Sequence, residues 1–205
     1  MANTDNPFGL RPVRHRSGAP YNGACRPYYI QSDYATALFI GDPVVITGAV
    51  NTAAVAAPGA GSFPVGALQS VNKATVNTGA ITGVIVGFCK RADQGQYNPA
   101  STECVVLVAD DPDLEFEIQC DSTFTPASVG LNAALIYTHS GSTLTGRSAA
   151  ELDSGTTTAP GTSAGLQLKV KGFVNREDND MAAANSKLLV QINVHTLASA
   201  SAGIS

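Results

Sequence analysis

The chain has 205 residues with 12 basic and 16 acidic side chains, which gives a formal net charge of −4. Charged residues make up 14%, well below the average of about 25%, whereas the apolar content of 44% is ordinary. This composition argues against a disordered chain, which needs high charge and few apolar residues, and against a generally basic nucleic-acid binder. A single domain of this length needs neither disulfides nor a metal to fold. Because so little charge is available for a free surface, we expect other protein chains to cover part of it.

No segment of the sequence predicts a targeting signal or a membrane span. The N-terminus carries Arg11 and Pro12 where a signal peptide would place its apolar core. The longest uncharged stretch, residues 43–72, is interrupted by glycines and prolines, whereas a spanning helix needs about 20 mostly apolar residues in a row. We therefore expect a soluble protein, made in a cytoplasm, with no membrane partner.

Residues 1–27 are predicted to form an extended basic N-terminal arm. They hold four arginines and a single acid, Asp5, with several prolines and no period of 2 or 3.6. Proline lacks a backbone donor, so an arm outside the β body is favoured over a strand or helix. The remaining 178 residues carry a net charge of −7, which would repel nucleic acid. Arginine forks bind carboxylates well, so we expect the arm to clasp an acidic surface of another subunit, using Phe8, Arg11, Arg14, Arg16, Tyr21 and Arg26.

Residues 28–197 are predicted to form a β-rich body. Short strands are expected at 43–47 and 65–71, each beside a glycine or proline turn signal. The run at 81–88 is almost entirely apolar, which is typical of a strand buried on both faces.

An acidic hairpin is expected next, with strands at 103–109 and 114–120 around the turn Asp110-Asp111-Pro112-Asp113. In the second strand apolar and polar residues alternate, which predicts one wet face. A calcium loop is disfavoured because Pro112 stands in the turn and no glycine follows. A glycosidase pair is disfavoured because its two carboxylates must flank a substrate across a cleft, whereas Glu115 and Glu117 would lie on the same face of one strand. The hairpin is either simply solvated or an acidic surface for a basic partner, formed by Asp110, Asp111, Asp113, Glu115 and Glu117.

The last third of the chain begins with a Ser/Thr/Gly/Ala-rich region, residues 122–165. It is expected to hold a short helix near 125–128, a strand at 133–138 and a loop from 140 to 165. Apolar and polar residues then alternate over 166–171 and 188–195, which predicts two more strands. Residues 198–205 form a small-residue C-terminal tail. The expected fold is mainly β: a compact β-sandwich or barrel-like body of short antiparallel strands, with an extended N-terminal arm and little helix.

No pattern of residues indicates catalysis. The four cysteines lie far apart without a C-x-x-C pair, which favours free, partly buried thiols over a zinc site. His15, His139 and His195 have no motif companion, and the glycines form no nucleotide-binding loop. We therefore expect a non-enzymatic protein with no catalytic residue, metal or cofactor.

Five short sequence motifs carry a resemblance to a known family. They are residues 6–13 (NPFGLRPV), 39–44 (FIGDPV), 83–88 (GVIVGF), 109–112 (ADDP), and 171–179 (KGFVNREDN) with the strand that follows to His195. Together they resemble the virion structural proteins of tailed bacteriophages, in particular capsid decoration or cement proteins. The resemblance implies a non-enzymatic, β-rich body that oligomerises on the outer shell, often as a trimer, and fastens neighbouring major-capsid subunits.

The leading hypothesis is therefore a capsid decoration protein on the virion surface. Its partners would be the major capsid protein and copies of itself, with a trimer favoured over a dimer, and it would bind neither nucleic acid nor membrane. The alternative is a tail or adhesin β module that binds a host receptor or glycan. An aromatic content of 6% and the absence of Trp weigh against a sugar-binding platform.

Overall fold

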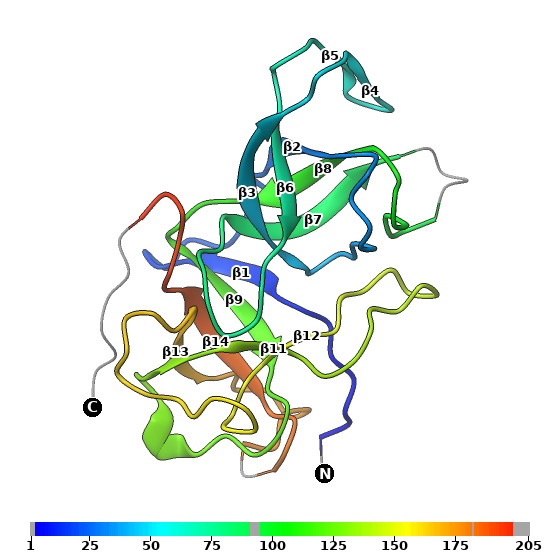
Figure 1. Ribbon diagram of the computed structural model, residues 1–205. Helices are drawn as coiled ribbons and strands as arrows, with labels where there is room; N and C mark the ends of the chain where they lie inside the picture. The colour runs from blue at the N-terminus through cyan, green and yellow to red at the C-terminus, as the bar shows by residue number, and fades with distance from the viewer. Residues whose placement is uncertain (1–2, 91–94, 182, 199–205) are drawn as a thin grey trace.

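The computed structural model describes residues 3–90, 95–181 and 183–198, and the fold is mainly β (Figure 1). Strands account for 41% of the residues. The described residues contain no α-helix, and the helix expected near 125–128 is a 3₁₀ turn, η2 (Pro126–Ser128). The predicted fold class, β-rich with little helix, is thus confirmed.

The upper part of the molecule is a closed barrel with the strand order β2-β6-β3-β7-β8 (Figure 1). Its strands are β2 (Arg26–Ile30), β3 (Pro43–Val50), β6 (Gln69–Lys73), β7 (Gly83–Cys89) and β8 (Cys104–Ala109). All neighbours pair antiparallel except β2 and β6, which are parallel. The side chains of Val44, Val71, Ile85 and Val106 belong to its core.

A small hairpin projects from the end of this barrel, at the top of Figure 1. It consists of β4 (Val55–Ala57) and β5 (Gly61–Phe63). Val55 and Ala57 pack into a cluster with Tyr29, which anchors the base of the hairpin.

The lower part is a five-stranded sheet with the order β1-β9-β14-β13-β10. The strands are β1 (Arg11–His15), β9 (Leu114–Gln119), β10 (Asn132–Ala133), β13 (Leu168–Phe173) and β14 (Lys187–Ile192). A two-stranded sheet of β11 (Leu135–Tyr137) and β12 (Ala150–Leu152) lies next to it, joined by a bridge between Cys120 and Leu152.

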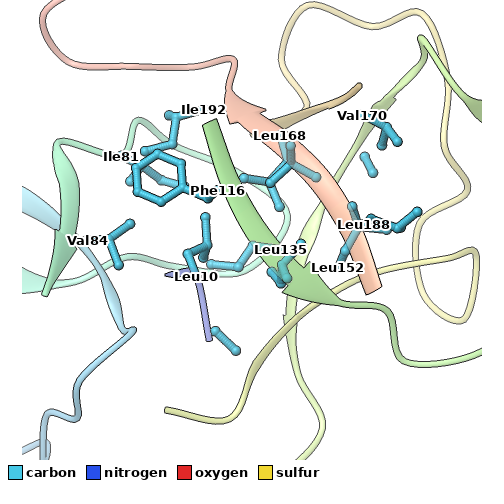
Figure 2. Close-up of a cluster of buried hydrophobic side chains, with 14 of the residues drawn as sticks. Leu10, Ile81, Val84, Phe116, Leu135, Leu152, Leu168, Val170, Leu188 and Ile192 are labelled. Atoms are coloured by element: carbon cyan, nitrogen blue, oxygen red, sulfur yellow. The ribbon is translucent and has the colours of Figure 1, made fainter. Parts of the chain in front are cut away.

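One cluster of buried side chains joins the two parts (Figure 2). Phe116, Leu168 and Leu188 come from the five-stranded sheet, whereas Ile81 and Val84 come from the barrel side. Leu10, from the N-terminal segment, lies in the same cluster with 1% of its surface exposed.

The prediction that residues 103–120 form a β-hairpin around the turn at 110–113 is wrong. Strand β8 pairs with β2 and β7, and β9 pairs with β1 and β14, so the turn leads from the barrel into the other sheet. The two strands differ in pattern for this reason. β8 is apolar along its length and largely covered in the barrel, whereas the alternating β9 turns its apolar side toward the core.

The prediction that residues 1–27 form an arm outside the β body is also wrong. Residues 11–15 form edge strand β1, and Arg26 already begins β2 in the barrel. Proline is tolerated at a sheet edge, and the β1–β9 register shifts between Pro12 and Arg14.

Two smaller expectations differ from the structure, and two are confirmed. Strand β12 interrupts the region expected to be a loop, and β6 begins only at Gln69, after an exposed Val65. The last two predicted strands are confirmed as neighbours β13 and β14. Of the predicted tail, residues 199–205 lie outside the described residues.

Candidate partner-binding surface

The arginines of the N-terminal segment, residues 3–27, form a ladder of ion pairs with acidic residues of the same chain. β1 lies antiparallel to β9, so that Arg11 stands opposite Glu117 and Arg14 lies opposite Glu115. Arg11 forms an ion pair with Glu117, and the Nε atom of Arg14 lies 2.7 Å from Glu115 Oε2. The ladder continues along the turn at residues 110–113, where Asp113 lies 3.2 Å from Arg16, Asp111 lies 3.3 Å from His15 and Asp110 lies 3.6 Å from Arg26.

The wet acidic face expected for residues 114–120 is absent from β9. Glu115 and Glu117 are only 5% and 3% exposed, although their side chains point away from the apolar core. Two layers cover them: the arginines of β1, and Arg176, whose Nη2 atom donates to Glu117 Oε1 at 2.8 Å. The long aliphatic stems of arginine can shield carboxylates while the charged heads stay half exposed.

The arginine–carboxylate pairing was therefore anticipated correctly in chemistry but assigned to the wrong chain. All four expected arginines face carboxylates of their own chain. The reason is the turn at residues 110–113, which places β9 beside the N-terminal segment. Alternation along a strand predicts its two faces but not what covers each one.

Two buried tyrosines of β2 donate hydrogen bonds to the carboxylates that flank β8, Asp110 of the ladder at one end and Glu103 at the other. Tyr28 Oη donates to Asp110 Oδ2 at 2.8 Å, and Tyr29 Oη donates to Glu103 Oε2 at 2.7 Å. Burial, followed by these hydrogen bonds to carboxylates, raises the pKa of Tyr28 and raises that of Tyr29 to about 12. Both tyrosines therefore remain neutral donors at physiological pH.

A cavity of about 350 Å³ lies between the N-terminal segment and the barrel. Three of the six predicted contact residues, Phe8, Arg11 and Tyr21, line it, together with Ile85 of β7. Arg14, Arg16 and Arg26 lie outside it. The Arg11 guanidinium carbon also lies 5.4 Å from the centre of the Phe8 ring, which adds a cation–π contact to its ion pair.

Backbone contacts hold the walls of this cavity in place. The Leu10 N–H donates to Gly41 O at 3.0 Å, and the Gly41 N–H donates to Ile85 O at 2.8 Å. On the other side, the Ile40 N–H donates to Gly146 O at 2.8 Å. These hydrogen bonds fix the backbone from which the lining side chains project.

Sequence reasoning missed Arg147, which also lines the cavity. Between Asp121 and Glu151 it is the only arginine, lysine or acid in the sequence. The only sequence signal for Arg147 was its position as an isolated charge in a long uncharged stretch. Such a single residue forms no periodic pattern or motif that would have marked it as part of a binding site.

The cysteines and the buried His195 are side chains with potential for chemistry. The four cysteines are free, with Cys104 and Cys120 buried. Within the described ranges, no group of three His, Cys, Asp or Glu side chains could hold a metal ion. His195 is buried, and its Nδ1 atom accepts a hydrogen bond from the Leu197 N–H at 3.0 Å.

Comparison with known proteins adds no relative. No protein-family model, no curated protein and no solved structure matches this chain. Within the part of the chain that the structure describes, no helix is long and apolar enough to cross a bilayer.

Proposed function

We propose that this chain is a non-enzymatic capsid decoration protein of a tailed bacteriophage. It binds the outer surface of the capsid and stabilises contacts between major capsid subunits. It is made in the host cytoplasm and acts on the virion, as a homo-oligomer for which a trimer is favoured over a dimer. The sequence resemblance motivates this proposal, and one feature of the surface supports it.

That feature is the uncharged projection at the end of the barrel. Residues 43–72 contain no charged side chain, yet most of residues 52–69 are exposed, including the whole tip of the β4–β5 hairpin. Val50 and Val65 are 40% and 63% exposed. Depletion of charge and exposed apolar side chains are typical of the centre of a protein–protein interface.

The ion pairs within the chain also support contacts with neighbours through uncharged surface. Within the described residues, the arginines of the N-terminal segment and Arg176 are engaged by carboxylates of their own chain. These ion pairs hold β1 against β9 and tie Arg16 and Arg26 to the turn at residues 110–113. Contacts with neighbours would then rest largely on uncharged surface, as in a shell where each subunit packs against several others.

The test is a rebinding experiment. Shells prepared without this protein are incubated with the purified full chain, and bound protein is quantified after sedimentation. A decoration protein saturates the shells at a fixed ratio to the major capsid protein. If the chain ignores the shells and instead binds intact host cells, the alternative of a receptor- or glycan-binding β module is favoured and the present proposal is wrong.

A further inference from the structure

We infer that the cavity between the N-terminal segment and the barrel is a docking site for an extended segment of a partner protein that carries a carboxylate next to an apolar side chain. This inference rests on the proposed function, in which the partner is a capsid subunit. It names the chemistry by which the partner is recognised.

The cavity offers an apolar floor. Leu10 and Ile85 are each 1% exposed and form its base, whereas Phe8, Ile40 and Val86 are half-buried and form its sides. Its volume of about 350 Å³ is at the lower end of the range for small-molecule pockets, about 300–1,000 Å³. That size suits an apolar side chain and its backbone better than a large cofactor.

The rim offers one uncompensated positive charge. Among the residues that the structure describes, Arg147 is the only arginine without a carboxylate within ion-pair distance, whereas the other five are all paired. Arg11 also lines the cavity, but it is engaged in an ion pair with Glu117. Arg147 is exposed at the rim, so a partner that supplies a carboxylate there is complementary to it in charge.

The surroundings favour a peptide segment as the carrier of that carboxylate. Gln96 and Thr145 line the cavity beside Arg147 and offer an amide and a hydroxyl to a partner's backbone. Because the walls are held by backbone hydrogen bonds, binding would require little ordering of this chain, which lowers the cost of association.

The experiment uses the full chain labelled with ¹⁵N and two short synthetic peptides, blocked at both ends. One peptide contains an Asp-Leu pair between glycines and the matched peptide contains Asn-Leu. We expect the Asp-Leu peptide to shift the amide signals of Leu10, Gly41 and Ile85, and the Asn-Leu peptide to bind at least several-fold more weakly.

Arg147→Gln should weaken binding of the Asp-Leu peptide roughly three- to five-fold, the range expected for one partly exposed ion pair. Lys171→Gln, which removes an exposed charge outside the cavity, should leave it unchanged.

Three results would overturn the inference: equal binding of both peptides, no effect of Arg147→Gln, or absence of shifts at the cavity. A fourth is the appearance of the same shifts on concentrating the chain alone, because a second copy would then be the occupant. The proposed function fails separately, in the rebinding experiment. If the chain saturates shells and Arg147→Gln does so equally well, the decoration role stands and this docking site does not.

Discussion

Gly9 lies so close to Gly41 that a Cβ atom on Gly9 would stand 2.3 Å from the Gly41 carbonyl oxygen. In return, a Cβ atom on Gly41 would stand 2.5 Å from Phe8 O. Both glycines have left-handed backbone, with φ of +74° and +94°. This backbone contact fastens the N-terminal segment to the barrel and sets the position of Leu10 in the core.

Gly9→Ala should therefore be strongly destabilising. The substitution combines a left-handed φ with a backbone clash that no side-chain rotation can relieve, and we expect a loss of about 3 kcal/mol or more. The control is Gly18→Ala, with a similar φ of +92° but no atom within 4 Å, which should cost only about 1–2 kcal/mol. Urea unfolding of both variants measures the difference. Equal losses would show that the close contact with Gly41 does not constrain the fold.

Deletion of residues 1–16 should unfold the body rather than merely weaken its attachment to shells. The deletion removes β1 from the edge of β9 and takes Leu10 out of the core. Loss of a buried leucine side chain alone costs about 2–5 kcal/mol. Circular dichroism and thermal unfolding would record a lower midpoint or loss of cooperativity. A truncated chain that unfolds at the same temperature as the full chain would instead support a separate arm.

Glu117→Gln should cost about 2 kcal/mol, within the range for hydrogen bonds to charged groups. It weakens the acceptor shared by Arg11 and Arg176 at a position that is 3% exposed. By contrast, Arg16→Gln breaks a pair whose side chains are 62% and 56% exposed, and should cost less than about 1 kcal/mol. The denaturation midpoints of the two variants, each compared with the unsubstituted chain, measure the two losses of stability. A larger loss for Arg16→Gln would contradict the assignment of the ladder's strength to its buried end.

Stability should fall as the pH drops below about 6.5 because of His195. Burial lowers the pKa of this imidazole below its ordinary 6.5, although nearby Asp110 and Asp111 oppose the shift. In that range the unfolded chain takes up a proton at His195 that the folded chain does not, which favours unfolding. Urea titrations at pH 7.5 and 5.5 should therefore differ less in His195→Asn than in the natural chain. An equal difference between the two pH values in both chains would contradict the prediction.

The chain should self-associate through its uncharged projection. Val65→Lys places a charge on the more exposed of the two exposed valines of that region and should shift light scattering toward the monomer. Val129→Lys, on another exposed valine beside η2, serves as the control and should not. Observation of only monomers at high concentration, together with monomers in the particle, would contradict the prediction.

Much of the secondary structure was predictable because it depends on local pattern. Leu188, Val190 and Ile192 alternate with polar residues and form β14, with its apolar side in the core as expected. The apolar run predicted at 81–88 forms barrel strand β7 from Gly83 onward, although its second half is only half-buried. The low helix content follows from the absence of any long amphipathic segment. A period of two is set by the strand itself and needs no knowledge of neighbours.

Only the tertiary structure decided which surfaces these strands share. The pattern of β9 predicted that Glu115 and Glu117 lie on one face, but the partner strand β1 and Arg176 arrive from about 60 to 105 positions away in sequence and convert that face from wet to buried. The same holds for Arg147, whose isolation became meaningful only when the fold placed it beside Phe8 and Ile85. Strand pairing and ion-pair partners are long-range choices made by packing of the whole chain, and local periodicity carries no information about them.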